Sequence, residues 1–581
     1  MGEIVSDQSL LDKVSQEKLM EYTRTISSEV RLSGSEEEWR AFLYAKGVLD
    51  ELGLRTKLKT SKAFVSWPIS ADMKVDGVSY PCITHSMAVS TGGEGLSGEI
   101  VYIGAGTDEE YESAEVKGKV LLIDGLAIPG AVAKAQEEGA KGLVFINAEY
   151  THEMIVSTVW GNPTPQKQNQ YPNLPVISIN YADGEKVKQK LKGKESLPIW
   201  FKTEVETGWK DIPTLEAELK GTDPTGSFVL FSGHIDSWHY GAMDNGTANA
   251  VMLEVARVLS EEKVELNRSL RFAFWSGHSH GRYAGSALYC DENWEELYES
   301  CVLHVNIDSV GAKESVVLTE GNCMAETKDI AGQVIKDQVS EEYEGSRFGR
   351  AGDQSFWGPG VPSLLMGLSE QVPATTAAAQ AFTRLFGAGK GGGFGWWWHT
   401  TEDTMDKIDP EFLERDCRIY LSIIDKACTS DVLPIDQRKA VEELKSHLVH
   451  YQEAAPELKK LSIALSRISQ LHNKIKSVYE RIESENLSDE QLAEANRWIH
   501  SLSKGLVHLN YVGGNVFDHD QAMGQPPIPL LADILKWKEI TENEPEHFVF
   551  LTGINRNLNQ VNFILKELLE KAGQTSLLKE G

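Results

Sequence analysis

The feature that most constrains the fold is an alternation of apolar runs and helical patterns between residues 212 and 430. Runs of buried-strand length stand at 228–232, 271–275, 302–307 and 363–366, and a helical pattern fills 248–259. Parallel strands need long crossover connections, which are usually helices. The pattern therefore predicts an α/β fold whose centre is a doubly wound, mostly parallel sheet.

The remainder of the chain predicts further units around that sheet. At 581 residues the chain is longer than one hydrophobic core usually organises. Short β-rich runs fill residues 66–205. Beyond Pro434, apolar residues recur at the three-and-four spacing of a helix, and Ser488 and Gln491 form a predicted capping box there. We predict the N-terminal part of the catalytic domain at 1–65, an inserted domain at 66–205, the catalytic domain at 206–432 and a helical domain at 433–581.

The charge balance limits the partners. The formal net charge is -29 at pH 7, and such an acidic surface repels nucleic acid and anionic membranes. No apolar run approaches the roughly 18 residues of a membrane span, and the N-terminus lacks the pattern of a signal peptide. The six cysteines are scattered without a CxxC pair, which favours free thiols. We expect a cytoplasmic protein that binds neither nucleic acid nor membrane.

Polar residues of metal-ligand type follow the predicted strands. His234 and Asp236 come after the first strand, Asp244 lies eight residues beyond Asp236, Asp308 closes the third strand, and His399 follows a glycine-rich loop. In open α/β sheets, sites form at the carboxyl ends of the strands. Imidazole and carboxylate ligands suit zinc. These residues therefore predict a metal site at one edge of the sheet.

Each of these residues also has an ordinary structural interpretation. A lone buried histidine is more often hydrogen-bonded in a core, and an aspartate at a strand end often caps the next helix. Their combination at the ends of separate strands favours metal binding, because unpaired buried polar groups are costly. We expect one or two zinc ions per chain, or another divalent metal.

The spacing of these residues resembles that of a known family. His-x-Asp, then Ala-x-Asp-Asn-Gly, then Asn-x-Asp-x-x-Gly, then His-Thr-x-x-Asp-Thr is similar to the co-catalytic zinc aminopeptidases and carboxypeptidases. The architecture looks like the branch of glutamate carboxypeptidase II and the transferrin receptor. GEIVYIG and VKGKVLLID resemble strands of that branch's protease-associated domain, and NRWIHSLSKGLVHLNY resembles its helical dimerisation domain. The resemblance implies a homodimer formed through the C-terminal helical domain.

The resemblance also implies roles for single residues. His234 and Asp308 would hold one zinc ion and His399 a second, with Asp244 bridging the two. Asp236 would orient His234 through its carboxylate.

The chain departs from the family pattern after Trp275. The family has two adjacent glutamates there, the general base and a zinc ligand, whereas this chain reads Gly-His-Ser-His-Gly. Counting forward from Trp275 puts His278 at the base position, and counting back from Gly285 puts His280 at the ligand position. We predict His278 as a metal ligand, with His280 and Asp236 as catalytic groups. The alternative count, in which His280 is the ligand, stays open.

Two further segments are predicted to shape the substrate pocket. Arg350 and Asp353 lie in a loop that resembles one of the family's loops. Trp398 precedes His399 in a run of tryptophans, which favours an aromatic or apolar substrate group. Glycines at 387, 389, 391, 392, 393 and 395 predict a mobile loop that can close over the site.

These observations predict a metal-dependent hydrolase of peptide or small amide substrates. The metal would polarise the carbonyl and activate a water molecule. The alternative is a catalytically inactive binding or scaffold protein of the transferrin receptor type, because both family glutamates are replaced.

Overall fold

The computed structural model describes residues 8–319, 321–371, 394–539 and 545–578. Its strands are β1 (Arg55–Val75), β2 (Val78–Tyr80), β3 (Ile83–Thr84), β4 (Leu96–Tyr102), β5 (Val120–Asp124), β6 (Gly142–Ile146), β7 (Val176–Ile179), β8 (Leu197–Leu219), β9 (Phe228–His234), β10 (Ser269–Trp275), β11 (Cys301–Asn306), β12 (Asn322–Cys323) and β13 (Ser363–Leu365). They form one sheet in the order β12-β13-β11-β9-β10-β8-β4-β5-β6-β7-β3, and β1 and β2 pair beside this path.

The predicted apolar runs form the parallel half of that sheet. β9 lies between β10 and β11, β13 lies beyond β11, and all of these neighbours are parallel. Every residue of β9 is buried, because both faces of this half are covered by helices, and residues Phe228 to Phe231 are accordingly all apolar. The prediction of a doubly wound, mostly parallel sheet is confirmed.

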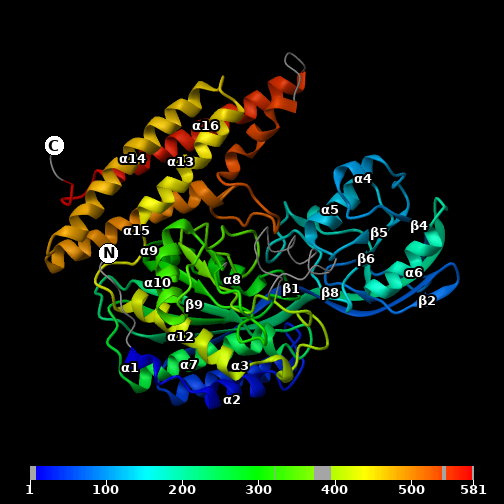
Figure 1. Ribbon diagram of the computed structural model, residues 1–581, viewed down its shortest axis with the longest axis horizontal. Helices are drawn as coiled ribbons and strands as arrows, with labels where there is room; N and C mark the ends of the chain where they lie inside the picture. The colour runs from blue at the N-terminus through cyan, green and yellow to red at the C-terminus, as the bar shows by residue number, and fades with distance from the viewer. Residues whose placement is uncertain (1–7, 320, 372–393, 540–544, 579–581) are drawn as a thin grey trace.

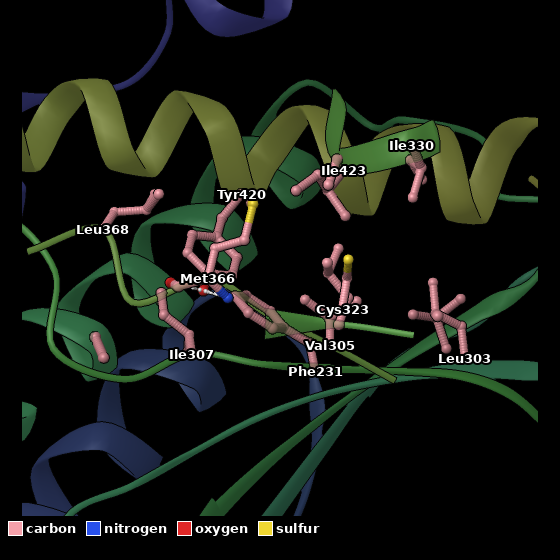
Figure 2. Packing of buried hydrophobic residues seen from close by; sticks show 14 of the residues in the cluster. Phe231, Leu303, Val305, Ile307, Cys323, Ile330, Met366, Leu368, Tyr420 and Ile423 are labelled. Atoms are coloured by element: carbon pink, nitrogen blue, oxygen red, sulfur yellow. Dashed lines mark hydrogen bonds between the residues drawn. The ribbon is translucent and has the colours of Figure 1, made fainter. Parts of the chain in front are cut away.

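The helices around this half pack on opposite faces (Figure 1). One face carries α2 (Gln16–Ile26), α3 (Glu36–Glu51), α7 (Ala248–Glu261), α10 (Lys328–Val339) and α12 (Pro410–Thr429), with the short α1 (Gln8–Leu11) beside them, and the other carries α8 (Ala284–Glu292) and α9 (Trp294–Ser300). Phe231 of β9 stacks on Tyr420 of α12 with ring centroids 5.8 Å apart, and Figure 2 shows the apolar cluster around this pair. Its neighbour Leu230 packs toward Leu297 of α9. Alternate residues of one strand thus supply two cores.

A long antiparallel ribbon of β1 and β8 joins the catalytic half to the inserted part. Residues 197–201 of β8 pair with β4, and residues 215–219 pair with β10. The predicted domain boundaries after Val65 and after Val205 therefore fall inside continuous strands. This ribbon therefore connects the inserted part to the parallel half of the sheet, since β8 pairs with strands of both.

The inserted part is a small α/β unit. β4, β5, β6 and β7 are parallel neighbours with buried apolar residues, as the sequence pattern predicts. Its helices are α4 (Asp108–Glu112), α5 (Pro129–Glu137) and α6 (Tyr181–Leu191).

The C-terminal part consists of long helices packed on one another. They are α13 (Gln437–Ala454), α14 (Lys459–Ser484), α15 (Asp489–Tyr511) and α16 (Pro545–Ala572), with a 3-10 segment at Pro529–Glu539. The predicted capping box of α15 is present, with Ser488 and Gln491 each bonding the other's backbone N–H. The apolar stripe of α14, including Leu461, Ile468 and Val478, is buried within the chain itself. Among the described helices, none combines the length and apolar character needed to cross a membrane.

Candidate metal centre

The centre of the site is His234, the last residue of β9, which is 1% exposed. Its Nδ1 lies 2.9 Å from the carbonyl oxygen of Asp236, so Nδ1 donates there and Nε2 faces the other way. This Nε2 lies 3.3 Å from Asp244 Oδ1 and 3.7 Å from Asp308 Oδ1, and it has no hydrogen bond among the described residues. A buried acceptor that faces two carboxylates suits a shared cation.

Asp244 lies between His234 and His399. It stands in the π-helical turn Ala242–Thr247 that leads into α7, and its Oδ2 is 3.0 Å from His399 Nε2. Its backbone N–H donates to Asp403, whose pKa is raised to about 7 by burial. Sequence reasoning gave Asp403 no role, although it is the aspartate of the His-Thr-x-x-Asp-Thr motif. Asp244 thus lies between the two histidines, and its role as a bridging ligand stays a prediction.

His278 joins the cluster from the loop after β10. Its ring stacks on that of His234 with centroids 3.7 Å apart and planes at 12°. One ligand-type atom from each of His234, His278 and Asp308 lies within 4.8 Å of the others. Beyond His278, Arg282 and Tyr283 take left-handed φ angles of 47° and 65° just before α8.

His280 lies behind this cluster and is completely buried. Its Nδ1 is 3.0 Å from Ser33 Oγ, which donates to Asp236 Oδ2 at 2.6 Å. Burial lowers the pKa of His280 to about 4, so the ring is neutral. Asp236 also accepts the Ser279 backbone N–H at 2.8 Å, so its carboxylate organises the loop. The catalytic roles predicted for Asp236 and His280 stay predictions.

Asp353 contacts His278 directly. Its Oδ2 is 2.9 Å from His278 Nδ1, and its Oδ1 accepts the Ser286 hydroxyl at 2.8 Å. Asp353 is 1% exposed. A carboxylate on one imidazole nitrogen fixes the ring and makes the other nitrogen a better metal ligand. The structure therefore places Asp353 where it orients His278, and its predicted contact with substrate stays a prediction.

The other two predicted pocket residues, Arg350 and Trp398, both pack against aromatic rings. The Arg350 guanidinium packs on Trp160 and Trp357, with its central carbon 4.0 and 4.6 Å from the ring centroids. Trp398 stacks on His399 at 3.4 Å with planes at 18°. Substrate binding by these two side chains stays a prediction. The predicted lid glycines between 387 and 393 lie outside the described residues.

The inserted part contributes a segment that holds His399 in place. The carbonyl oxygen of Glu153 accepts from His399 Nδ1 at 2.7 Å, and the Glu153 N–H donates to the His399 carbonyl at 2.9 Å. The ring of Tyr150 stacks on Trp396 at 4.7 Å. These contacts leave His399 Nε2 to face Asp244. No sequence signal marked Glu153, because its contacts with His399 are made by its backbone atoms.

Comparison with known proteins agrees with this geometry. Residues 215–424 match the model of Peptidase family M28, and residues 96–187 match that of the PA domain. The first stretch is therefore similar to M28 peptidases, and the second is similar to PA domains. The resemblance to the zinc peptidases that the motifs predicted is confirmed at this level.

The chain has distant relatives of known name. The chain is 22% identical over 426 residues to the probable glutamate carboxypeptidase VP8 of Zea mays, covering 61% of this chain but only 56% of that protein. It is 24% identical over 363 residues to the aminopeptidase YwaD of Bacillus subtilis, covering 61% and 72% of the two chains. The solved aminopeptidase from Aneurinibacillus sp. strain AM-1 has a TM-score of 0.55 at 21% identity, covering 73% of this chain and 96% of that one. This structural likeness shows a shared fold.

Charges around the site favour a cation at the cluster. Burial acts to lower the pKa of His234, but Asp236, Asp244 and Asp308 outweigh it and raise that pKa well above its ordinary value. Burial likewise acts to raise the pKa of Asp244, and His234 and His399 reverse this. The Asp244 carboxylate thus stays ionised beside this buried nitrogen. Nitrogen and oxygen donors in this charge state fit zinc.

Proposed function

We propose that this protein is a metal-dependent hydrolase of peptide or related amide bonds. The observation that carries the proposal is the buried Nε2 of His234, which faces Asp244 and Asp308 and has no hydrogen bond among the described residues. The similarity to M28 peptidases around this cluster supports the same reaction class.

We propose that His234, His278 and Asp308 hold one zinc ion, with Asp244 next to it. In the family pattern a glutamate directly follows the base position, and here that residue is Ser279. A second ion would therefore have only Asp244 and His399 from the predicted set, which is fewer than a closed zinc site requires. Bound zinc would polarise the substrate carbonyl and lower the pKa of a bound water.

The side chains around the ion would position it and move protons. Asp353 holds His278 Nδ1, and Glu153 holds His399 Nδ1, so both rings present Nε2 inward. Asp236 and His280 are connected through Ser33 Oγ, and we propose this connection as the route for a proton.

We further propose a peptide or small amide substrate, contacted by Arg350, Asp353 and Trp398, and no nucleic-acid or membrane partner. The net charge of -29 supports the second statement. A cytoplasmic location is supported by the cysteines, which are all unpaired. A homodimer through the C-terminal helices is proposed from the family resemblance, since the stripe of α14 is already covered within the chain.

The second candidate function is an inactive binding protein with this fold. The replacement of both family glutamates by His278 and Ser279 favours it. Metal content separates the two candidates, because a scaffold has no need for a bound ion.

The experiment is metal analysis of purified protein together with peptidase assays on amino-acid anilides and short peptides. We expect about one zinc per chain and loss of turnover with a chelator. His278→Ala should lose zinc and activity together, whereas His280→Ala should keep zinc, and His278→Glu should keep zinc with a changed pH optimum. Metal-free protein with no turnover favours the inactive protein. If His280→Ala instead loses zinc, the two histidines have the opposite roles.

A further inference from the structure

The ribbon of β1 and β8 has two outer edges, one on each strand. The register of the pairing shows which N–H and C=O groups face outward at each edge. In antiparallel pairs, opposite residues alternate between bonding each other and turning N–H and C=O outward. Phe64 lies opposite Trp209, and Ser66 lies opposite Thr207. The Phe64 N–H leaves the ribbon to donate to Asn162 Oδ1 at 2.8 Å. The two pairs lie two residues apart along each strand, so both pairs are of the same type and turn their N–H and C=O groups outward.

The outward groups of β1 have partners. The Ser66 N–H donates to the His280 carbonyl at 2.8 Å, and the Ser66 carbonyl accepts the Ser86 hydroxyl at 2.6 Å. The Asn162 amide donates to the Lys62 carbonyl at 3.1 Å. This edge of the ribbon is therefore closed by neighbouring loops.

The matching edge of β8 is covered only in part. Val205 exchanges two hydrogen bonds with Ser90, from its N–H to Oγ at 2.9 Å and from Oγ to its carbonyl at 3.1 Å. Beyond it, the N–H and C=O groups of Thr207 and Trp209 have no hydrogen bond within the described part of the chain. Both side chains are exposed, Trp209 to 54%. An open strand edge is a template for another strand.

A cavity of about 660 Å³ adjoins this edge. Its walls include Phe64, Met87, Tyr171, Val205 and Trp209. Phe64 lies edge-on between Tyr171 at 5.3 Å and Trp209 at 5.6 Å. This volume lies within the usual range of ligand pockets, roughly 300 to 1,000 Å³.

The charges around the cavity are already compensated. None of the residues that line it is charged. Along the same stretch of β8, Glu206 pairs with Lys210, and Asp211 pairs with Lys62. A charged ligand group would be desolvated there without gaining a counter-charge. An uncharged segment complements this surface.

We propose that the β8 edge at Thr207 and Trp209 binds an extended peptide segment by strand addition, with its uncharged, apolar side chains in the adjoining cavity. Main-chain hydrogen bonds to the two open residues supply general affinity, and the cavity selects alternate side chains. The site is distinct from the metal cluster and does not depend on the proposed hydrolase activity.

The test uses the full chain and a fluorescent peptide, acetyl-SVTFTVS-amide, whose blocked ends and a chelator in the buffer prevent cleavage. Binding is followed by fluorescence anisotropy. N-methylation of one alternate set of its amides should abolish binding, and N-methylation of the other set should leave it, because only one set faces β8. A peptide with glutamate in place of its valines and phenylalanine should not bind.

Protein variants locate the site. Thr207→Pro removes an outward N–H that the ribbon does not use, and Trp209→Ala removes the exposed wall of the cavity, so each should weaken binding at least about tenfold. Glu206→Ala, whose side chain points to the opposite face, is the matched control and should bind normally. Unchanged thermal unfolding of the variants excludes misfolding.

Three results would overturn the proposal. The first is absence of binding by the wild-type chain. The second is binding that neither Thr207→Pro nor N-methylation affects, which would mean that no strand is added. The third is self-association of the wild-type chain in analytical ultracentrifugation that both Thr207→Pro and Trp209→Ala abolish, which would assign the edge to a second copy of this chain.

Discussion

Replacing Asp353 by asparagine tests whether this buried carboxylate prepares His278 for metal. The Oδ2 to Nδ1 distance is 2.9 Å and Asp353 is 1% exposed, so water can scarcely substitute for this contact. A hydrogen bond to a charged group contributes about 1.5 to 3 kcal/mol, and 1.4 kcal/mol corresponds to a tenfold change in an equilibrium constant. Asp353→Asn keeps an acceptor but removes the charge. We therefore expect zinc affinity to fall by about 10- to 100-fold.

The assay is competition for zinc against a chromophoric chelator at fixed pH. Ser286→Ala is the matched control, because Ser286 donates to the other oxygen of Asp353 and leaves its charge in place. Its effect on zinc affinity should be smaller. Equal zinc affinity of wild type and Asp353→Asn, with unfolding temperatures also equal, would refute the idea that Asp353 acts through His278.

Three further predictions concern stability. Burial raises the pKa of Glu326 to about 7, so the stability that its neutral form contributes is fully present below the unfolded-state pKa and is lost as pH rises toward 7. The free energy of unfolding of Glu326→Gln should therefore exceed that of wild type by up to about 3 kcal/mol at pH 8 and by almost nothing at pH 4. Urea unfolding at the two pH values measures this difference. Asp409 caps α12 by accepting from the backbone of Glu411 and Phe412, so Asp409→Ala should cost about 1 kcal/mol in the same assay. Phe231→Ala should cost about 3 to 5 kcal/mol, because its ring is fully buried, and a loss below about 1 kcal/mol would contradict the packing in Figure 2.

The catalytic half of the fold could be predicted from sequence because its strands are covered on both faces. The first four residues of β9, Phe228 to Phe231, are all apolar, and this uninterrupted run leads to the ligand-type His234 at the end of the strand. The ribbon strand β1 was harder to delimit. It is partly exposed along its length and lacks an uninterrupted apolar run, so the predicted domain boundary after Val65 falls inside it.

The histidine register could not be predicted because it depends on where the loop absorbs one extra residue. Counting forward from Trp275 and counting back from Gly285 are equally valid starting points, because both residues have fixed places in the fold. A Cβ on Gly285 would lie 2.3 Å from the Ser276 carbonyl oxygen, so the loop must close tightly there. The left-handed φ angles at Arg282 and Tyr283 lie beyond His280, where the chain turns into α8, and the register of the two histidines stays a prediction. Such angles are rare for these residue types and leave no sequence signature.

The orientation of His399 shows why motifs predict candidate ligands but not the contacts that hold them in place. Its motif identifies an imidazole, but the nitrogen that faces Asp244 is decided by the Glu153 carbonyl, 246 residues earlier in the chain. A backbone carbonyl accepts a hydrogen bond whatever its side chain is, so substitution at Glu153 leaves this contact intact. Displacement of the inserted part would break this contact, because it consists of two hydrogen bonds. The His399 Nδ1 donates to the Glu153 carbonyl, and the Glu153 N–H donates to the His399 carbonyl. The position of the His399 ring therefore depends on the docking of the inserted part as well as on its own motif.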